Sequence, residues 1–189
     1  MAPAEKTSPV TMSLQAAVKV WSEKNPEKKI EEEAMVKLIC TTPPIDRIDS
    51  SLAQFRAVVH LSLSTNCIDK IPPLPALPNL RILSLGRNQI KKISGLDEVG
   101  GVLRELWISY NQITALDGLA CCVALETLFI ANNKIKEIAE LKKLGVNGKL
   151  ANVNFFGNPL AEGASRAETR VLIAANCPGV KIVDGEVIT

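Results

Sequence analysis

The sequence has few of the side chains from which active sites are built. Its one histidine, His60, would have to serve any catalytic triad, and the nearby Ser62 and Ser64 come with no obvious acid partner. Five cysteines occur without a C-x-x-C pair, and only that histidine could join them in a zinc site. Their odd, unpatterned number is typical of a reduced, intracellular protein. We therefore expect a protein that is not an enzyme and that holds no metal or cofactor.

Charge, hydropathy and glycine motifs exclude further classes. Lysine and arginine number 22 against 20 aspartates and glutamates, and the resulting net charge of +2 does not favour nucleic acid. No stretch approaches the roughly 20 apolar residues of a membrane span. Met1 to Lys6 show no apolar segment behind a basic start, so we expect no secretory signal. The nucleotide motifs G-x-G-x-x-G and G-x-x-x-x-G-K-[ST] do not occur, which directs attention to protein-binding surfaces.

An asparagine recurs through the chain inside one apolar pattern, L-x-x-L-x-L-x-x-N-x-I. The clearest copies start at Leu80, Leu103 and Leu125. The asparagines follow one another at intervals of 22, 23, 22 and 25 residues: Asn66, Asn88, Asn111, Asn133 and Asn158. This period is that of the leucine-rich repeat. We predict an α/β fold, a leucine-rich-repeat solenoid of about six repeats of 22–25 residues, with a parallel sheet on one face, short helical returns and helical caps at both ends.

Each part of the repeat has a physical role. The leucines of L-x-L point inward from a short strand, and the residue between them points outward onto the concave face. The asparagine after the strand can bond the backbone of its own turn and of the neighbouring coil. Removing one such buried partner should cost about 1–3 kcal/mol. Because no repeat buries its apolar side alone, both ends of the stack must be covered.

The pattern divides the chain into three parts. Residues 1–34 are expected to form a leader and capping helices, residues 35–160 the repeats, and residues 161–189 a C-terminal cap. The cap should contain a helix from Arg170 to Pro178, followed by a closing strand and turn from Val180 to Gly185.

The N-terminal end is less regular. Ser13 can cap a helix with apolar residues at helical spacing, and a second, shorter helix is expected from Glu27 to about Glu33. The first repeat is degenerate: Leu38 and Cys40 fall on its strand positions and Pro43 on the asparagine position. At the other end of the repeats, a longer return containing Asn147 accounts for the last interval of 25 residues.

Aromatic residues make up only 4% of the chain, yet four of them fall on neighbouring outward positions. An exposed apolar patch of this kind marks a binding site, and tryptophan, tyrosine and arginine are frequent hot spots. The alternative is that the rings only shield one another on the sheet. We expect the protein-binding surface to comprise Trp107, Tyr110, Phe129, Phe156, Ile82 and Asn132, with Arg87 and Glu105 as its polar rim.

Lysines gather in the turns after the asparagines. They are Lys70, Lys91, Lys92, Lys134 and Lys136, followed by Lys142, Lys143 and Lys149. Stacked repeats would align them as a basic edge, which is either a solvated rim or a salt-sensitive contact for an acidic partner such as tubulin.

Two further segments allow alternative interpretations. Pro72 to Pro78 contains P-x-x-P spacings that could bind an SH3 domain, but its leucines fall in a return and favour packing. Cys121 and Cys122 are adjacent and could form a redox pair, although a packed thiol is the simpler interpretation.

The sequence resembles the leucine-rich-repeat light chains of outer-arm axonemal dynein. The segments His60–Asn66, Asn79–Asn88 and Glu105–Ile113 carry the resemblance, which extends from about residue 14 to Gly185. The family's charged segment beyond the Asp-Gly of the cap has no counterpart before Thr189, so any role of that segment is not carried over.

The resemblance implies a soluble, non-enzymatic subunit of cilia and flagella, located in the cytoplasm and the axonemal cytoskeleton. It would bind the γ-type dynein heavy chain at the microtubule-binding end of the stalk and regulate motor activity. The aromatic concave patch with which the family binds its heavy chain maps onto Trp107, Tyr110, Phe129 and Arg87. Tubulin is a second candidate partner, and we expect the isolated chain to be monomeric. A different repeat adaptor, of the phosphatase-regulator or spliceosomal-scaffold type, shares the leucine pattern but is not expected to combine Trp107-Ile-Ser-Tyr with Arg87.

Overall fold

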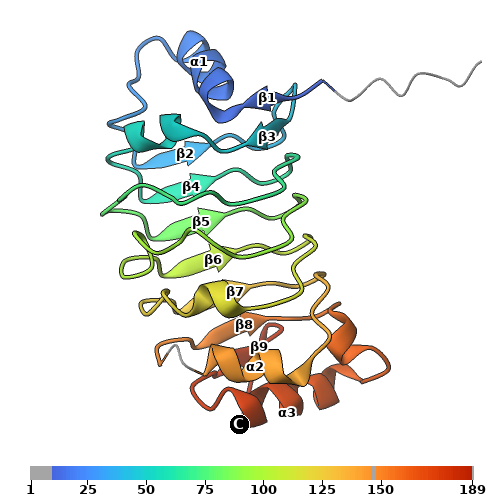
Figure 1. Ribbon diagram of the computed structural model, residues 1–189. Coiled ribbons are helices and arrows are strands. Elements are labelled where there is room, and N and C mark those ends of the chain that lie inside the picture. Colours follow the sequence, from blue (N-terminus) through green and yellow to red (C-terminus); the bar gives the residue numbers. More distant parts are fainter. Residues whose placement is uncertain (1–9, 146–147, 189) are drawn as a thin grey trace, which may run out of the picture.

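The chain folds into a solenoid of stacked coils, seen from the side in Figure 1. The structure is a computed structural model and describes residues 10–145 and 148–188. Among these residues, eight strands form one sheet in the order β10-β9-β8-β7-β6-β5-β4-β2. Neighbours run parallel except β9 and β10, so the predicted leucine-rich-repeat solenoid with a parallel sheet is confirmed. The strands are β2 (Met35–Lys37), β4 (His60–Ser62), β5 (Ile82–Ser84), β6 (Glu105–Trp107), β7 (Thr127–Phe129), β8 (Asn152–Asn154), β9 (Ile182–Val183) and β10 (Glu186–Val187).

The central residue of each strand lies in the core. Leu61, Leu83, Leu106, Leu128 and Val153 follow one another in the sheet register, and all are buried. Because side chains alternate along a strand, the residues on either side of them lie on the concave face. Apolar residues of the returns complete the core from the opposite side. The isoleucines that follow the repeat asparagines are buried as well: Ile68, Ile90, Ile113 and Ile135.

The strand prediction for the first repeat was wrong by two residues. Val36 pairs with Leu61, and the buried residues of this coil are Val36 and Leu38 rather than Leu38 and Cys40. Cys40 instead lies in the turn after the strand, where it is exposed and has a φ of 51°.

A longer turn explains the error. Thr41, not Pro43, occupies the asparagine position of the first repeat, and its hydroxyl donates to Asn66 Oδ1 at 2.8 Å. Ile45 keeps the place of the later isoleucines, since its carbonyl accepts from Cys67 N at 2.8 Å. Four positions separate Thr41 from Ile45, whereas two separate each later asparagine from its isoleucine. The two additional residues hid the shift in the sequence.

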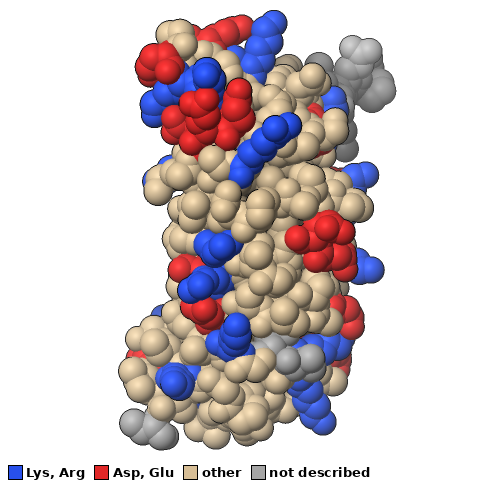
Figure 2. Space-filling model, turned by 90° about the vertical axis from the view of Figure 1, so that its left-hand side faces the viewer, with Lys and Arg blue, Asp and Glu red and all other residues tan. Residues whose placement is uncertain are grey.

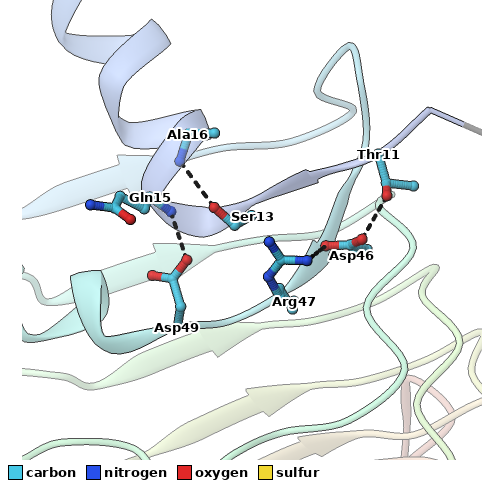
Figure 3. A network of polar contacts seen from close by, with 7 residues as sticks. All are labelled: Thr11, Ser13, Gln15, Ala16, Asp46, Arg47 and Asp49. Carbon is cyan, nitrogen blue, oxygen red and sulfur yellow. Dashed lines mark hydrogen bonds and ion pairs between the residues drawn. The ribbon is translucent and has the colours of Figure 1, made fainter.

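Helix α1 (Leu14–Lys24) lies across the N-terminal edge of the sheet (Figure 1). Ser13 caps it as predicted: its Oγ accepts from Ala16 N at 3.3 Å. Asp49 from the first return accepts from Gln15 N at 3.1 Å, so a second acceptor satisfies the helix start (Figure 3). The buried face of the helix is formed by Leu14, Ala17 and Val18.

A small second sheet fixes the segment before this helix. Strand β1 (Met12–Ser13) runs parallel to β3 (Ile45–Arg47), which the sequence did not indicate. Thr11 donates to Asp46 Oδ2 at 2.6 Å, and Arg47 lies 3.7 Å from the other oxygen of that carboxylate (Figure 3). The segment directly before α1 is thereby tied to the first coil.

The predicted second helix, from Glu27 to Glu33, is wrong. The chain forms separate turns there, closed by Lys28 N to Asn25 O and Glu32 N to Lys29 O. Ile30 is the one apolar residue of the segment and is buried, so a helix would have had no apolar face to cover the core.

The returns are helical in only some coils. Pro72 to Pro78 has no helix, and its Leu74 and Leu77 are buried, as expected of packing residues. The predicted long return around Asn147 lies partly outside the described residues, since residues 146–147 are not described. Helical returns are η1 (Ser50–Gln54), η2 (Asp117–Leu119), α2 (Ile138–Leu144) and η3 (Pro159–Ala161).

The C-terminal end is covered by helix α3 (Arg166–Asn176), which begins four residues before the predicted start. Ser165 and Glu168 form a reciprocal capping box that fixes this earlier start. The chain then adds β9 beside β8 and turns back through Asp184 and Gly185 into β10. Both turn residues have positive φ, 51° and 84°, as a two-residue hairpin requires. No helix of residues 10–145 and 148–188 has the length and apolarity to cross a bilayer.

Candidate protein-binding surface

Trp107 and Phe129 lie side by side on the concave face. Their strands pair in register, and the rings stack with centroids 5.9 Å apart at 25°. His60 meets the other side of the indole edge-on, at 5.4 Å and 72°. The indole is outside the core, because the inward residues on either side of it, Leu106 and Ile108, are the fully buried ones.

Polar contacts hold this group in place. The indole Nε1 of Trp107 donates to Glu105 Oε2 at 2.9 Å, and His60 Nε2 lies 3.2 Å from Ser84 Oγ. Ser84 is buried although it faces the concave side. Ile82 pairs with Glu105 in the register and is half-buried beside it. Trp107 therefore has a defined orientation before any partner arrives.

The remaining two aromatic rings are exposed. Tyr110 and Phe156 have 48% and 46% of their surface accessible. Each carries a guanidinium on its ring: Arg87 Cζ lies 4.3 Å from the centroid of Tyr110, and Arg166 Cζ lies 4.6 Å from that of Phe156. Such cation–π contacts fix ring orientation at the surface. We call Trp107, Phe129, Tyr110 and Phe156 the aromatic strip.

A left-handed turn places the outer part of this surface. Arg87, Tyr110 and Asn132 each precede a ladder asparagine and have φ of 55°, 58° and 54°. The last coil has Gly157 at this position, with φ of 77°. A Cβ there would come within 2.4 Å of Asn132 Oδ1, so the absence of a side chain allows the Asn132 amide to lie against the last turn.

The surroundings of His60 favour its uncharged form. Its pKa is lowered from the ordinary value, mainly because of burial and further by the positive charge of Lys37, while Glu105 acts in the opposite direction. Its bonded hydroxyl belongs to Ser84 of the next strand rather than to Ser62 or Ser64. His60 therefore contributes an aromatic ring and one hydrogen bond to the concave face.

Two functional candidates at the C-terminal end were missed by the repeat pattern. Asp184 Oδ1 accepts from the backbone N–H groups of Phe155 and Phe156, at 2.7 and 3.0 Å. Arg166, the first residue of α3, covers the Phe156 ring. Both come from the cap, outside the repeating pattern, so their sequence positions gave no sign that they border the aromatic strip.

The ladder asparagines link consecutive coils. In Asn111, Oδ1 accepts from Ile90 N at 2.9 Å, and Nδ2 donates to Leu85 O and Ile108 O, both at 3.0 Å. Leu85 O also accepts from Asn88, at 3.0 Å. Neighbouring asparagines thus share carbonyl acceptors, and the same arrangement recurs at Asn66, Asn88, Asn133 and Asn158.

The expected basic edge is interrupted. The coil after Asn111 has Thr114 and Ala115 where its predecessor has Lys91 and Lys92. Lys143 is also engaged, since its Nζ lies 2.7 Å from both Asp117 and Glu140. On the opposite edge, where the strands begin, Figure 2 shows basic and acidic side chains mixed among wide uncharged areas. The lysines after the asparagines therefore do not form a continuous basic edge from coil to coil.

Two of the five cysteines, Cys122 and Cys177, are buried. Cys122 is fully buried, and burial, with the neighbouring Cys121, raises its pKa far above the ordinary range. Burial also raises the pKa of Cys177 to about 11. Thiols with such pKa values are poor nucleophiles at neutral pH. Within the described part of the chain, no group of three histidine, cysteine or acidic residues could hold a metal ion.

Comparison with known proteins gives consistent matches. The family model "Leucine Rich repeats (2 copies)" matches residues 56–98 and 102–143. Dynein axonemal light chain 1 of Chlamydomonas reinhardtii is 42% identical over 177 residues, covering 92% of this chain and 89% of that protein. The Homo sapiens protein of the same name is 42% identical over 174 residues, covering 92% and 91%. Among solved structures, internalin C2 of Listeria monocytogenes has a TM-score of 0.56 and 29% identity over 74% of this chain and 60% of that one.

Proposed function

The chain belongs to the family of dynein axonemal light chain 1, and from that membership we propose that it binds an axonemal dynein heavy chain of the γ type. The proposed binding position is the microtubule-binding tip of the stalk, where the bound light chain regulates motor activity in the axoneme of a cilium or flagellum. It acts without catalysis and without a cofactor.

We assign heavy-chain binding to the concave face because of one observation: an oriented aromatic strip lies there on a rigid sheet. Its exposed rings provide apolar area, and contacts with Glu105 and His60 hold the Trp107 indole in one orientation. Large, pre-oriented aromatic side chains lose little conformational entropy when a partner binds, which makes them effective hot spots. The neighbouring side chains Ile82, Asn132, Arg87 and Glu105 border the strip and complete the proposed contact surface.

The test is the substitution Trp107→Ala, assayed against a purified stalk-tip fragment of the heavy chain by isothermal titration calorimetry. We expect a loss of about 2 kcal/mol or more in binding free energy, roughly 30-fold in Kd. Circular dichroism should show an unchanged fold, because the indole lies outside the core. Val123→Ala, at an exposed apolar residue of a return, is the control and should bind normally. Equal affinity of Trp107→Ala and the unaltered chain would remove the strip from the proposal.

A further inference from the structure

A hollow of about 240 Å³ lies at the C-terminal end of the aromatic strip, between Tyr110 and Phe156. The two rings follow β6 and β8, which are separated by two strand spacings, about 9.5 Å. Between them the intervening coil contributes Ala131 and Asn132, and the small, buried side chain of Ala131 leaves part of the space open. The hollow thus has an aromatic ring on each side and room for one side chain.

The polar residues that line this hollow include two with an unsatisfied oxygen. Asp184 Oδ1 is occupied by two backbone N–H groups, but Oδ2 is shielded from solvent and has no hydrogen-bond partner among the described residues. Asn154 Oδ1 is in the same condition, shielded and without a partner in this part of the chain. Unpaired buried acceptors are uncommon because they have lost water without gaining a donor. A donor that enters the hollow would satisfy them once the Asp184 and Asn154 side chains turn their shielded oxygens toward it.

We infer that the hollow receives an arginine side chain of the partner, an inference that rests on the proposed function. A guanidinium is planar, so it can stack on an aromatic ring of the hollow, and its five N–H donors can serve both oxygens once these turn toward it. Its positive charge complements the Asp184 carboxylate. The chain itself illustrates the affinity of these rings for guanidinium groups, since Arg87 and Arg166 each lie over one of them.

Other occupants fit less well. A lysine ammonium would meet the carboxylate but is a compact, strongly hydrated charge that cannot stack between two rings. A carboxylate or phosphate would face the unpaired oxygens with like charge and no donor. The positive charge of Arg166 at the rim opposes any cation, so it should weaken the binding of arginine rather than create it.

The first experiment uses small probes with the full chain. Nα-acetyl-arginine amide and its neutral isostere Nα-acetyl-citrulline amide are titrated by two-dimensional NMR, with the lysine amide as a third probe. The arginine amide should shift the amide resonances of Phe156, Asn154 and Asp184 and saturate at a concentration at least about tenfold below the other two. Equal responses to arginine and citrulline would overturn the charge argument. Stronger binding of the lysine amide would overturn the choice of arginine.

Asp184→Asn is the decisive variant. The new side chain keeps an oxygen for the N–H groups of Phe155 and Phe156 and tolerates the positive φ, but it replaces the unpaired Oδ2 with an NH₂ donor. We expect the fold and thermal stability to be maintained, and arginine-amide binding to weaken at least about tenfold. Asp97→Asn, with the same charge change at an exposed position in a return, is the matched control and should bind the probe normally. Arg166→Gln should tighten probe binding.

Binding to the heavy-chain stalk tip separates this inference from the proposed function. If Trp107→Ala weakens heavy-chain binding and Asp184→Asn does not, the arginine inference is wrong and the proposed function stands. If neither variant affects the heavy chain while the arginine amide still binds in the hollow, the proposed function is wrong and the arginine site belongs to another partner. Support for both requires Asp184→Asn to weaken heavy-chain binding by about tenfold or more, with Asp97→Asn unaffected.

Discussion

Replacing Asn111 with alanine tests how the stacked coils are held together. The substitution removes the acceptor of the buried Ile90 N–H, 2.9 Å away, and the donor to two buried carbonyls. Those carbonyls keep a second partner, because Leu85 O also accepts from Asn88 and Ile108 O from Asn133. The main cost is therefore one buried N–H without a partner, about 1–3 kcal/mol, plus the net value of the lost donor bonds, about 1 kcal/mol. We expect a total of roughly 2–4 kcal/mol.

A chain of this size loses about 2–4 °C in Tm per kcal/mol, so the midpoint should fall by roughly 4–16 °C. Differential scanning calorimetry measures this loss, with urea unfolding as an independent measure of the free energy. Asn79→Ala is the matched control: that amide is exposed and makes one bond, to Arg56 O at 3.2 Å. It should change the unfolding free energy by no more than about 0.5 kcal/mol.

Asn111→Asp makes the test sharper. Aspartate has nearly the same shape and can still accept from Ile90 N–H, but its second oxygen would face the carbonyls of Leu85 and Ile108. Burying a charge against two acceptors should destabilise the protein more than alanine does at neutral pH. If the aspartate variant is milder than the alanine variant, side-chain volume and not the shared hydrogen bonds explains the recurring asparagine. If Asn111→Ala has the same Tm as the control Asn79→Ala, the proposed role of the asparagine hydrogen bonds in linking the coils is wrong.

Two further predictions concern packing and pH. Gly118→Ala should lower the free energy of unfolding in urea by at least about 2 kcal/mol, because the added Cβ would lie 2.0 Å from the Ile93 carbonyl oxygen. Gly101→Ala, whose Cβ would have no atom within 4 Å, is the control and should be neutral. Similar urea midpoints for the two variants would contradict this prediction. For Asp49, burial acts to raise the carboxyl pKa, but hydrogen bonds from Ser51 and Gln15 outweigh it and hold the pKa below its ordinary value. The ionised carboxylate therefore stabilises the fold fully above the unfolded pKa of about 3.9, and this stabilisation is lost as the pH falls through the lower folded pKa. The higher Tm of the unaltered chain relative to Asp49→Asn should accordingly disappear in acid. A difference in Tm that does not change with pH would contradict this.

The repeat region was predictable because its local pattern and its packing agree. Leu83, Leu106 and Leu128 lie in register as the 22–23-residue spacing requires, and the residues between the inward positions reach the concave face. The first repeat was not predictable, since two additional residues between Thr41 and Ile45 leave the apolar spacing after the turn intact while shifting the strand. Spacing alone does not distinguish an insertion before the turn from one after it.

The sequence predicted which residues form the outer part of the binding surface but not how exposed each of them is. The aromatic residues and Arg87 were identified from their positions in the repeat, but which rings are exposed depends on contacts across coils. Trp107 is half-buried because it lies between His60 and Phe129, whereas Tyr110 is more exposed because the left-handed turn carries it beyond the strand. Asp184 reaches the strip through the cap hairpin, which no repeat pattern describes.

The two halves of the aromatic strip suggest a division of roles in binding. Trp107 and Phe129 are stacked, and Trp107 is also held by its hydrogen bond to Glu105, so an alanine variant there removes local contacts of the free protein, within an unchanged fold, as well as contacts in the complex. Tyr110 and Phe156 are exposed and flank the hollow with its unpaired oxygens. Apolar area at the first pair contributes affinity for many partners, whereas at the second pair a partner with a suitable donor gains hydrogen bonds that a partner without one does not. Specificity for a particular heavy chain is therefore expected to depend on Asp184 and Asn154 more than on Trp107.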